Sequence, residues 1–244
     1  MWFETLIALA GVAAGAVAAI AGFGIGSLLT PAMAMQVDAR LAVAAVSIPH
    51  VIGTAFRFWL LGAQIDRRVL WSFGLTSAAG GLTGALLQRQ FSTPWLMVVF
   101  GALLLFTAAA EMSGLAQRMR FSGPAAWIAG AGSGLLGGLV GNHGGIRSAA
   151  LLGVDLPKTT FVGTATAVAL MVDGARVPVY LWQLGGRIGE LTLWIALATA
   201  GVLAGTVFGN RVLVRIPDRW FRRTVAVVLA VLGSVMLARG ILDR

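Results

Sequence analysis

Three arginines interrupt long apolar stretches of this chain, where a charged side chain is costly to bury. They are Arg57, Arg147 and Arg176, whereas the rest of the 18 lysines and arginines lie in or near predicted loops. A guanidinium presents a rigid fork of N–H donors that matches carboxylate, phosphate and similar oxyanions. Ionisable residues within apolar segments usually mark a pathway or a binding site. The three arginines therefore predict a site for an anion.

Arg147 follows a glycine-rich break in an apolar run. The segment 141–147 reads "GNHGGIR". Between its first glycine and the arginine it contains Asn142, His143, Gly144 and Gly145. A helix that begins after such a break points its first N–H groups and its positive dipole end at the break, which favours an anion. Glycine also lets a ligand approach the backbone. We therefore predict that this segment contacts the ligand. The alternative is that Arg147 satisfies a carbonyl or a buried carboxylate.

Arg57 and Arg176 each end a polar stripe with helical spacing. The first stripe is Ser47, His50, Thr54 and Arg57, and the corresponding residues of the second are Thr166, Ala169, Asp173 and Arg176. Residues three and four apart share one helix face, so we expect two helices to face one polar cavity and Asp173 to pair with Arg176. Proton coupling through Asp173 or His50 is a further hypothesis. Alternatively, both arginines extend to the membrane interface.

Composition excludes several other functions. The chain has no cysteine and only two histidines, so thiol catalysis, disulfides and an ordinary zinc site are not expected. We expect no metal or cofactor, and no enzyme activity, because no nucleophile has a partner base and an orienting acid. The net charge of +9 does not indicate nucleic-acid binding, since no soluble basic surface remains outside the apolar segments.

The elements that position these residues are membrane helices. Residues are 58% hydrophobic and 11% charged, which is typical of a polytopic all-α membrane protein. The amino-terminal segment is read as a retained helix, because it lacks a basic region. Two apolar runs, 24–36 and 145–153, are too short to span the bilayer. Long runs are predicted at 5–21, 39–62, 68–88, 94–112, 124–140, 158–183, 188–209 and 219–241.

The chain reads as two related halves, 1–112 and 124–244, joined by a linker at 113–123. A shift of 119 residues aligns Gly22 with Gly141, Ser47 with Thr166 and Arg57 with Arg176. A shift of 121 aligns the small-residue faces Gly80/Gly84 and Gly201/Gly205, which predict close helix packing. Each half is expected to contain a glycine-broken helix followed by three long helices. Paired broken helices in related halves indicate a transporter site near the membrane midplane.

Loop charges favour an inverted relation between the halves. If each broken helix is a re-entrant hairpin, ten basic residues fall on one side and five on the other. The five are Arg40, Arg89, Arg187, Arg239 and Arg244. A parallel arrangement gives at best eight against seven. The excess of basic residues on cytoplasmic loops therefore favours inversion, with the ten inside.

The glycine-rich motifs resemble those of the TauE/SafE family of membrane anion exporters. They are "GFGIGSLLTPAM" at 22–33 and "GNHGGIRSAALL" at 141–152, each followed by "VD", and "GTATAV" at 163–168 resembles that family's Ala-Thr-Ser motif. The second motif departs from the pattern at Asn142 and His143 and lacks a counterpart of Pro31. The resemblance implies export of sulfite, sulfoacetate or related organosulfonates across the inner or plasma membrane. It also points to the motif glycines as site residues: Gly22, Gly24, Gly26, Gly141, Gly144 and Gly145.

Three buried arginines against one aspartate suit a dianion or a monoanion with a second acidic group. We expect alternating access around a midplane site as the mechanism. An anion channel and a carrier of small carboxylates remain open as alternatives, and so does a homo-oligomer. The other expected partners are the small anion itself and the lipid bilayer.

Overall fold

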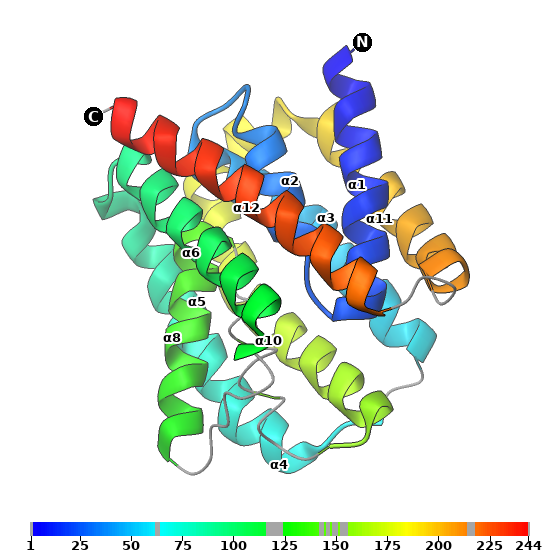
Figure 1. Ribbon diagram of the computed structural model, residues 1–244. Coiled ribbons are helices and arrows are strands. Elements are labelled where there is room, and N and C mark those ends of the chain that lie inside the picture. The colour runs from blue at the N-terminus through cyan, green and yellow to red at the C-terminus, as the bar shows by residue number, and fades with distance from the viewer. Residues whose placement is uncertain are drawn as a thin grey trace.

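The computed structural model describes residues 2–61, 64–115, 124–141, 144, 147, 151, 156–213 and 218–243, and all regular structure in these ranges is helical. Figure 1 shows a bundle of helices with both ends of the chain toward the top of the view. In chain order the helices are α1 (Trp2–Ala21), α2 (Ile25–Met33), α3 (Ala39–Leu61), α4 (Arg67–Val69), the π-helical turn η1 (Leu70–Gly74), α5 (Leu75–Leu87), the 3-10 turn η2 (Gln88–Gln90), α6 (Thr93–Ser113), α8 (Pro124–Val140), α10 (Lys158–Gly189), α11 (Thr192–Leu213) and α12 (Asp218–Leu242).

The helix lengths and the outer surface are those of a multi-pass membrane protein. Within the described residues, seven helical segments are long and apolar enough to cross a bilayer. Large apolar side chains lie on the outside of these helices, among them Leu9, Phe208, Val231 and Leu242. Such a surface suits a hydrocarbon solvent. The predicted membrane class is therefore confirmed.

Most predicted boundaries agree with the structure, and one does not. Helix α8 has the predicted bounds, and α2 occupies most of the predicted short run at 24–36. Helix α10, however, continues to Gly189 rather than ending at residue 183, and α11 begins at Thr192. Gly185 and Gly186 follow the predicted end, and although glycine disfavours helix, a single helix passes through them. Most of the predicted short helix at 145–153 lies outside the described residues.

The long helices pack in three principal pairs: α1 against α11, α5 against α8, and α6 against α12. Figure 1 shows the last pair as the green and red helices that cross the front of the bundle. Helices α3 and α10, which carry the polar stripes, also pack against each other. The predicted meeting of the two stripe helices is thus confirmed.

Glycines make the first two pairs close. A Cβ on Gly15 of α1 would meet the carbonyl oxygen of Val202, and one on Gly134 of α8 would meet that of Ser77. The predicted close packing through small residues is confirmed, because these helices approach backbone to backbone. The predicted register between the halves is wrong by one turn. Gly80 contacts Ala131 as Gly205 contacts Val12, so the third long helices align at a shift of 125 rather than 121.

Basic residues gather at one end of the bundle. There, Arg40 donates to the carbonyl of Phe91, Arg187 pairs with Asp38 at 2.9 Å, and Arg239 donates to the carbonyl of Ala34 at 3.2 Å. The end that carries these contacts is formed by the α2–α3 loop, the η2–α6 loop and the last turns of α10 and α12.

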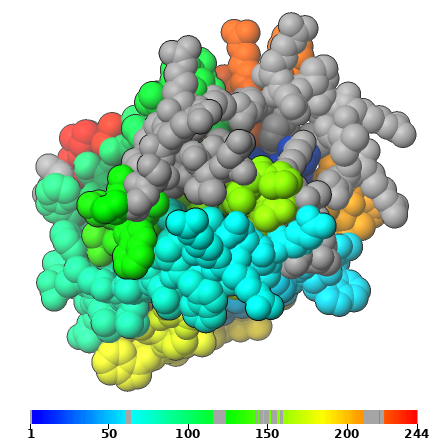
Figure 2. Space-filling model, turned by 90° about the horizontal axis from the view of Figure 1, so that it is seen from below, coloured from blue at the N-terminus to red at the C-terminus, as the bar shows by residue number. Residues whose placement is uncertain are grey.

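The opposite end brings α4 to the start of α10. The backbone N–H of Asp66 donates to the hydroxyl of Thr164 at 3.0 Å, and η1 packs against α10. Figure 2 views the molecule from this side, with residues of α4 and η1 in cyan beside the start of α10 in lime. Helix α10 therefore runs the full distance between the two ends.

Candidate functional site

Both first helices of the predicted halves end at a glycine in the same conformation. Gly22 follows α1 with φ of 75°, and Gly141 follows α8 with φ of 74°. The N–H of Gly22 donates to Ala18 at 3.1 Å, and that of Gly141 donates to Gly137 at 3.0 Å. A residue with a Cβ strains in this left-handed region, so glycine ends the helix cleanly. The two predicted breaks at 22 and 141 are confirmed, 119 residues apart.

The two breaks lie against each other in the interior. A Cβ on Gly26 would collide with the carbonyl oxygen of Gly141, and a Cβ on Gly144 would collide with the side chain of Phe23. Gly24 has φ of 133° and lies against Val17. Three of the predicted site glycines therefore also serve the packing of the breaks.

Arg57 and Arg176 hold these breaks in matching ways. Nη1 of Arg57 donates to the carbonyl of Ala18 at 2.6 Å, and Nη1 of Arg176 donates to that of Gly137 at 2.6 Å. These carbonyls lie in the last turns of α1 and α8, where a cation is favoured by the helix dipole. The side chains are only 4% and 1% exposed, so the alternative that they extend to the membrane interface is wrong.

Asp173 joins the two stripe helices. Its carboxylate accepts from Nε of Arg176 at 3.0 Å and lies 2.7 Å from Nδ1 of His50 on α3. All three side chains are buried, and the expected ion pair between Asp173 and Arg176 is confirmed. The contact with His50 was not predicted, because it links residues 123 positions apart. It places the two predicted proton-coupling residues in one hydrogen-bonded pair.

Arg147 reaches from the second break to the first. Its side chain is 2% exposed, and Nη2 donates to the carbonyl of Gly22 at 3.1 Å. The alternative that it satisfies a carbonyl is thus confirmed for one of its nitrogens. It also lies within electrostatic range of Arg57, Asp173 and Arg176. The residues predicted beside it, Asn142, His143 and Gly145, lie outside the described part of the chain.

We call the buried side chains of Arg57, Arg147, Asp173, Arg176 and His50 the arginine cluster. Several hydrogen-bond donors in and beside it have no acceptor within the described residues. Among the described residues, no partner is found for Nε of Arg57, for Nε and Nη1 of Arg147, or for the buried hydroxyls of Thr30 and Thr54. The buried charges in this part of the chain are three arginines and Asp173, and three minus one leaves a formal excess of +2, His50 aside. Buried unpaired donors and uncompensated cations are costly unless a ligand meets them. The cluster therefore has the chemistry of an anion site.

Ser47 and Thr166 lie on the two stripe helices, and both side chains are buried. Their hydroxyls donate to carbonyls of their own helices, at Ala44 and Val162. Their contact with a ligand stays a prediction.

Two buried polar residues that hold the end of α8 were missed by sequence reasoning. The hydroxyl of Tyr180 donates to the carbonyl of Gly138 in the last turn of α8. Gln88 was not singled out, although it is buried and donates to Leu139 at 2.8 Å. Its place at the end of an apolar run is typical of a loop residue, so only the fold reveals its role. Tyr180 carried a signal, since it stands one turn after Arg176 on the same face.

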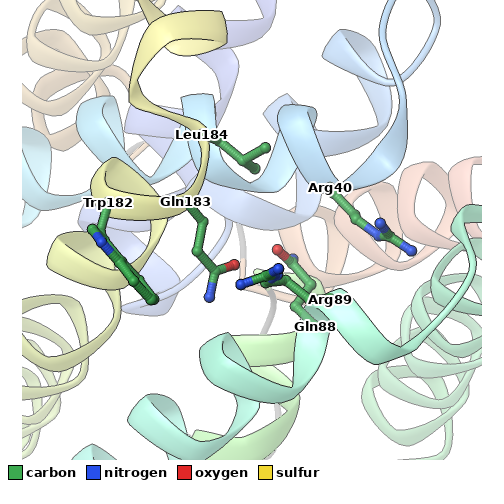
Figure 3. A pocket seen from close by; sticks show the side chains of 6 residues that line it. All are labelled: Arg40, Gln88, Arg89, Trp182, Gln183 and Leu184. Atoms are coloured by element: carbon green, nitrogen blue, oxygen red, sulfur yellow. The ribbon is translucent and has the colours of Figure 1, made fainter.

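A pocket of about 410 Å³ opens at the end of the bundle where basic residues gather. Figure 3 shows Gln183 extending from α10 toward Gln88 and Arg89 of η2, with Arg40 of α3 nearby. Nε of Arg40 and Oε1 of Gln183 have no partner among the described residues. Gln183 stands seven residues after Arg176 on α10, which is about 10 Å along the helix. The pocket is therefore displaced from Arg176 by about two turns of α10, toward the C-terminal end of that helix.

Comparison with known proteins identifies the family. Residues 7–236 match the family model described as sulfite exporter TauE/SafE. No curated protein matches the chain, and no solved structure matches it. The matched segment includes both helix breaks, both stripe helices and the three buried arginines. The chain therefore belongs to the TauE/SafE family of sulfite exporters.

Proposed function

We propose that this chain is a secondary transporter that exports small sulfur-containing anions, such as sulfite or sulfoacetate, across the inner or plasma membrane. The observation that carries the proposal is the set of guanidinium nitrogens on Arg57 and Arg147 that are buried beside the two helix breaks and find no partner in the described ranges. An anion with one or two acid groups would satisfy these donors and offset the excess positive charge. The family match independently favours a sulfur oxyanion.

The proposed architecture is two inverted repeats, 1–112 and 124–244, joined by the linker at 113–123. Packing of each half against the other supports this architecture. Helix α1 packs on α11 and α8 packs on α5, so the first helix of each half contacts the third long helix of the other. Such reciprocal contact is expected of two halves related by a twofold axis. The matched hydrogen bonds of Arg57 and Arg176 support the same relation.

In this architecture each broken helix is a re-entrant hairpin. For the first half, the ends of the hairpin lie at the same end of the bundle. Phe3 of α1 contacts Trp194 near the start of α11, with ring centroids 4.5 Å apart, and Arg187 just before α11 pairs with Asp38 after α2. Figure 1 traces α2 back toward the end at which α1 begins.

Transport then proceeds by alternating access around the arginine cluster. The pocket beside Gln183 is the mouth at the end that carries Arg40, Arg187 and Arg239. These arginines belong to the set of five basic residues rather than to the set of ten, so the positive-inside rule assigns this end to the outside. The segment 142–145 supplies further donors to the anion through Asn142, His143, Gly144 and Gly145. Asp173 and His50 couple a proton to transport, because their shared hydrogen bond links the two stripe helices.

Two rival proposals differ in their observable behaviour. A carrier of small carboxylates would use the same donors, and an anion channel would use the same positive lining without alternating closure. Assembly into a homo-oligomer would leave the site within each chain unchanged. Alternating access is preferred to a channel because Arg57, Arg147 and Arg176 all bind helix-end carbonyls of the breaks, which ties the site to the elements that would move. Sulfur-containing anions are preferred to carboxylates because of the family match.

The test is counterflow in proteoliposomes. Vesicles that contain purified protein and a high internal concentration of unlabelled sulfoacetate should accumulate external labelled sulfoacetate transiently above equilibrium. Internal sulfite should drive the same transient accumulation when it replaces internal sulfoacetate, and internal succinate should drive less. A flux that neither saturates nor shows counterflow would establish a channel, and preferential counterflow with succinate would establish a carboxylate carrier.

A further inference from the structure

The two halves of the arginine cluster differ at one chemically important position. Asp173 stands three residues before Arg176 and accepts a hydrogen bond from its Nε at 3.0 Å. At the matching position, 119 residues earlier, Thr54 stands three residues before Arg57. Both arginines bind the equivalent helix carbonyl through Nη1 at 2.6 Å. The first half therefore repeats the arrangement of the second without its carboxylate.

The atoms around the missing carboxylate are donors without acceptors. Nε of Arg57, the counterpart of the nitrogen that binds Asp173, has no partner among the described residues, and neither has the hydroxyl of Thr54. Thr54 is 0% exposed and Arg57 is 4% exposed. A buried N–H and O–H that face no acceptor are costly, whereas an ionised acid group would accept from both.

The residue that faces the carboxylate also differs between the halves. The imidazole of His50, from the first half, lies against the carboxylate of Asp173 in the second half. The residue that the same shift pairs with His50 is Ala169, which is fully buried. A methyl group thus replaces an imidazole on the side of Thr54. Thr54 lies on α3 and Ala169 lies on α10, and these two helices pack against each other.

We propose that an acid group of the transported anion sits beside Arg57 and Thr54, in the position that the carboxylate of Asp173 occupies beside Arg176. This inference rests on the proposed function and deepens it, because it assigns one half of the site to the substrate and the other to the protein's own aspartate. Two nitrogens of Arg147 have no partner within the part of the chain that the structure describes, and Arg147 lies in electrostatic range of Arg57, so it receives the remainder of the anion. A sulfonate that also bears a carboxylate fits this pair of positions.

The substitution Thr54→Asp tests the inference, because it gives the first half a carboxylate of its own. An aspartate three residues before Arg57 should form the ion pair seen between Asp173 and Arg176. Thr54→Asn has the same shape without the charge and is the matched control. A second control is Thr107→Asp, at a buried threonine of α6 that has no basic residue within four positions. The measurements are melting temperatures of the purified proteins with and without sulfoacetate or sulfite.

Without added anion, we expect Thr54→Asp to melt several degrees above both Thr54→Asn and the wild type, while Thr107→Asp melts below the wild type. Sulfoacetate or sulfite should raise the melting temperature of the wild type and leave that of Thr54→Asp unchanged. We expect the anion to bind Thr54→Asn at least tenfold more tightly than Thr54→Asp, since only the aspartate competes for Arg57.

Failure of the inference and failure of the proposed function give different results. If Thr54→Asp does not melt above Thr54→Asn in the absence of anion, the inference is overturned, whether or not the wild type binds an anion. The inference is also overturned if the wild type and Thr54→Asp respond equally to an anion, and the proposed function then stands. If the wild type responds to neither anion while Thr54→Asp is stabilised, the proposed function fails and the unfilled carboxylate position is upheld.

Discussion

At the scale of single residues, the cluster is a set of arginines of which one, Arg176, binds a carboxylate, that of Asp173. Arg57 and Arg147 bind main-chain carbonyls, and their other nitrogens include three without a partner among the described residues. A buried ion pair contributes little net stability, but removal of one partner leaves an isolated charge that is strongly destabilising. The pair on α10 and the unpaired arginines should therefore respond differently to neutralisation.

A double-mutant cycle on the pair measures this difference. Arg176→Gln and Asp173→Asn should each lower the free energy of unfolding by about 3 kcal/mol, because each strands the opposite charge inside the protein. The double variant should lose clearly less than the sum of the two. Thermal or denaturant unfolding of the purified proteins gives the three values. Additive losses would mean that the two side chains are not coupled and would contradict the geometry.

The polar stripes illustrate what residue spacing can and cannot predict. The 3-4-3 spacing of Ser47, His50, Thr54 and Arg57 correctly placed polar groups on one buried helix face. The same pattern did not reveal that Ser47 binds its own helix or that His50 meets Asp173 of the other half. Contacts between distant segments depend on how α3 and α10 pack, which spacing within either helix does not contain.

At the scale of elements, the first helix of each half is held by backbone contact at glycine. Gly134 of α8 faces the carbonyl of Ser77 on α5, with no room for a Cβ, while Gly132 of the same helix faces open space. The small-residue faces were recognised in the sequence, but the register between halves was wrong by one turn. Glycines four apart present the same pattern when shifted by four, so the pattern alone does not determine register.

The two glycines make a matched pair of variants. Gly134→Ala should lower the free energy of unfolding by about 1–3 kcal/mol, because the added methyl group forces α8 away from α5. Gly132→Ala should be neutral or stabilise by about 0.5–1 kcal/mol, since alanine is the better helix former. Melting temperatures of both variants check the prediction. Equal effects would show that α8 and α5 are not in backbone contact at Gly134.

At the scale of the whole molecule, the re-entrant architecture predicts which segments share a membrane face. The odd number of crossings in each half was inferred from loop charges, and the basic residues Arg40, Arg187 and Arg239 do meet at one end of the bundle. The inverted arrangement that the loop charges favour stays a prediction. Charge counting does not reveal the pocket, which arises where α3, η2 and α10 converge.

Single cysteines test this topology directly, because the chain has none of its own. Cysteines at positions 2, 36 and 90 should react with a membrane-impermeant maleimide from the same side in oriented vesicles. A cysteine at position 68 should react only from the other side. Labelling of positions 2 and 36 from opposite sides would mean that α1 and α2 together cross the membrane, and the inverted arrangement would then be wrong.

The most direct test of the central claim is equilibrium binding of sulfite and sulfoacetate to the purified protein by titration calorimetry. Arg147→Gln should weaken binding by about thirtyfold or more, because truncation of one partner in a buried charged contact costs ~2 kcal/mol or more. Arg187→Gln, which removes an exposed arginine paired with Asp38, should bind as the wild type does. If the wild type binds neither anion, or if Arg147→Gln binds as tightly as the wild type, the buried arginines do not form the anion site.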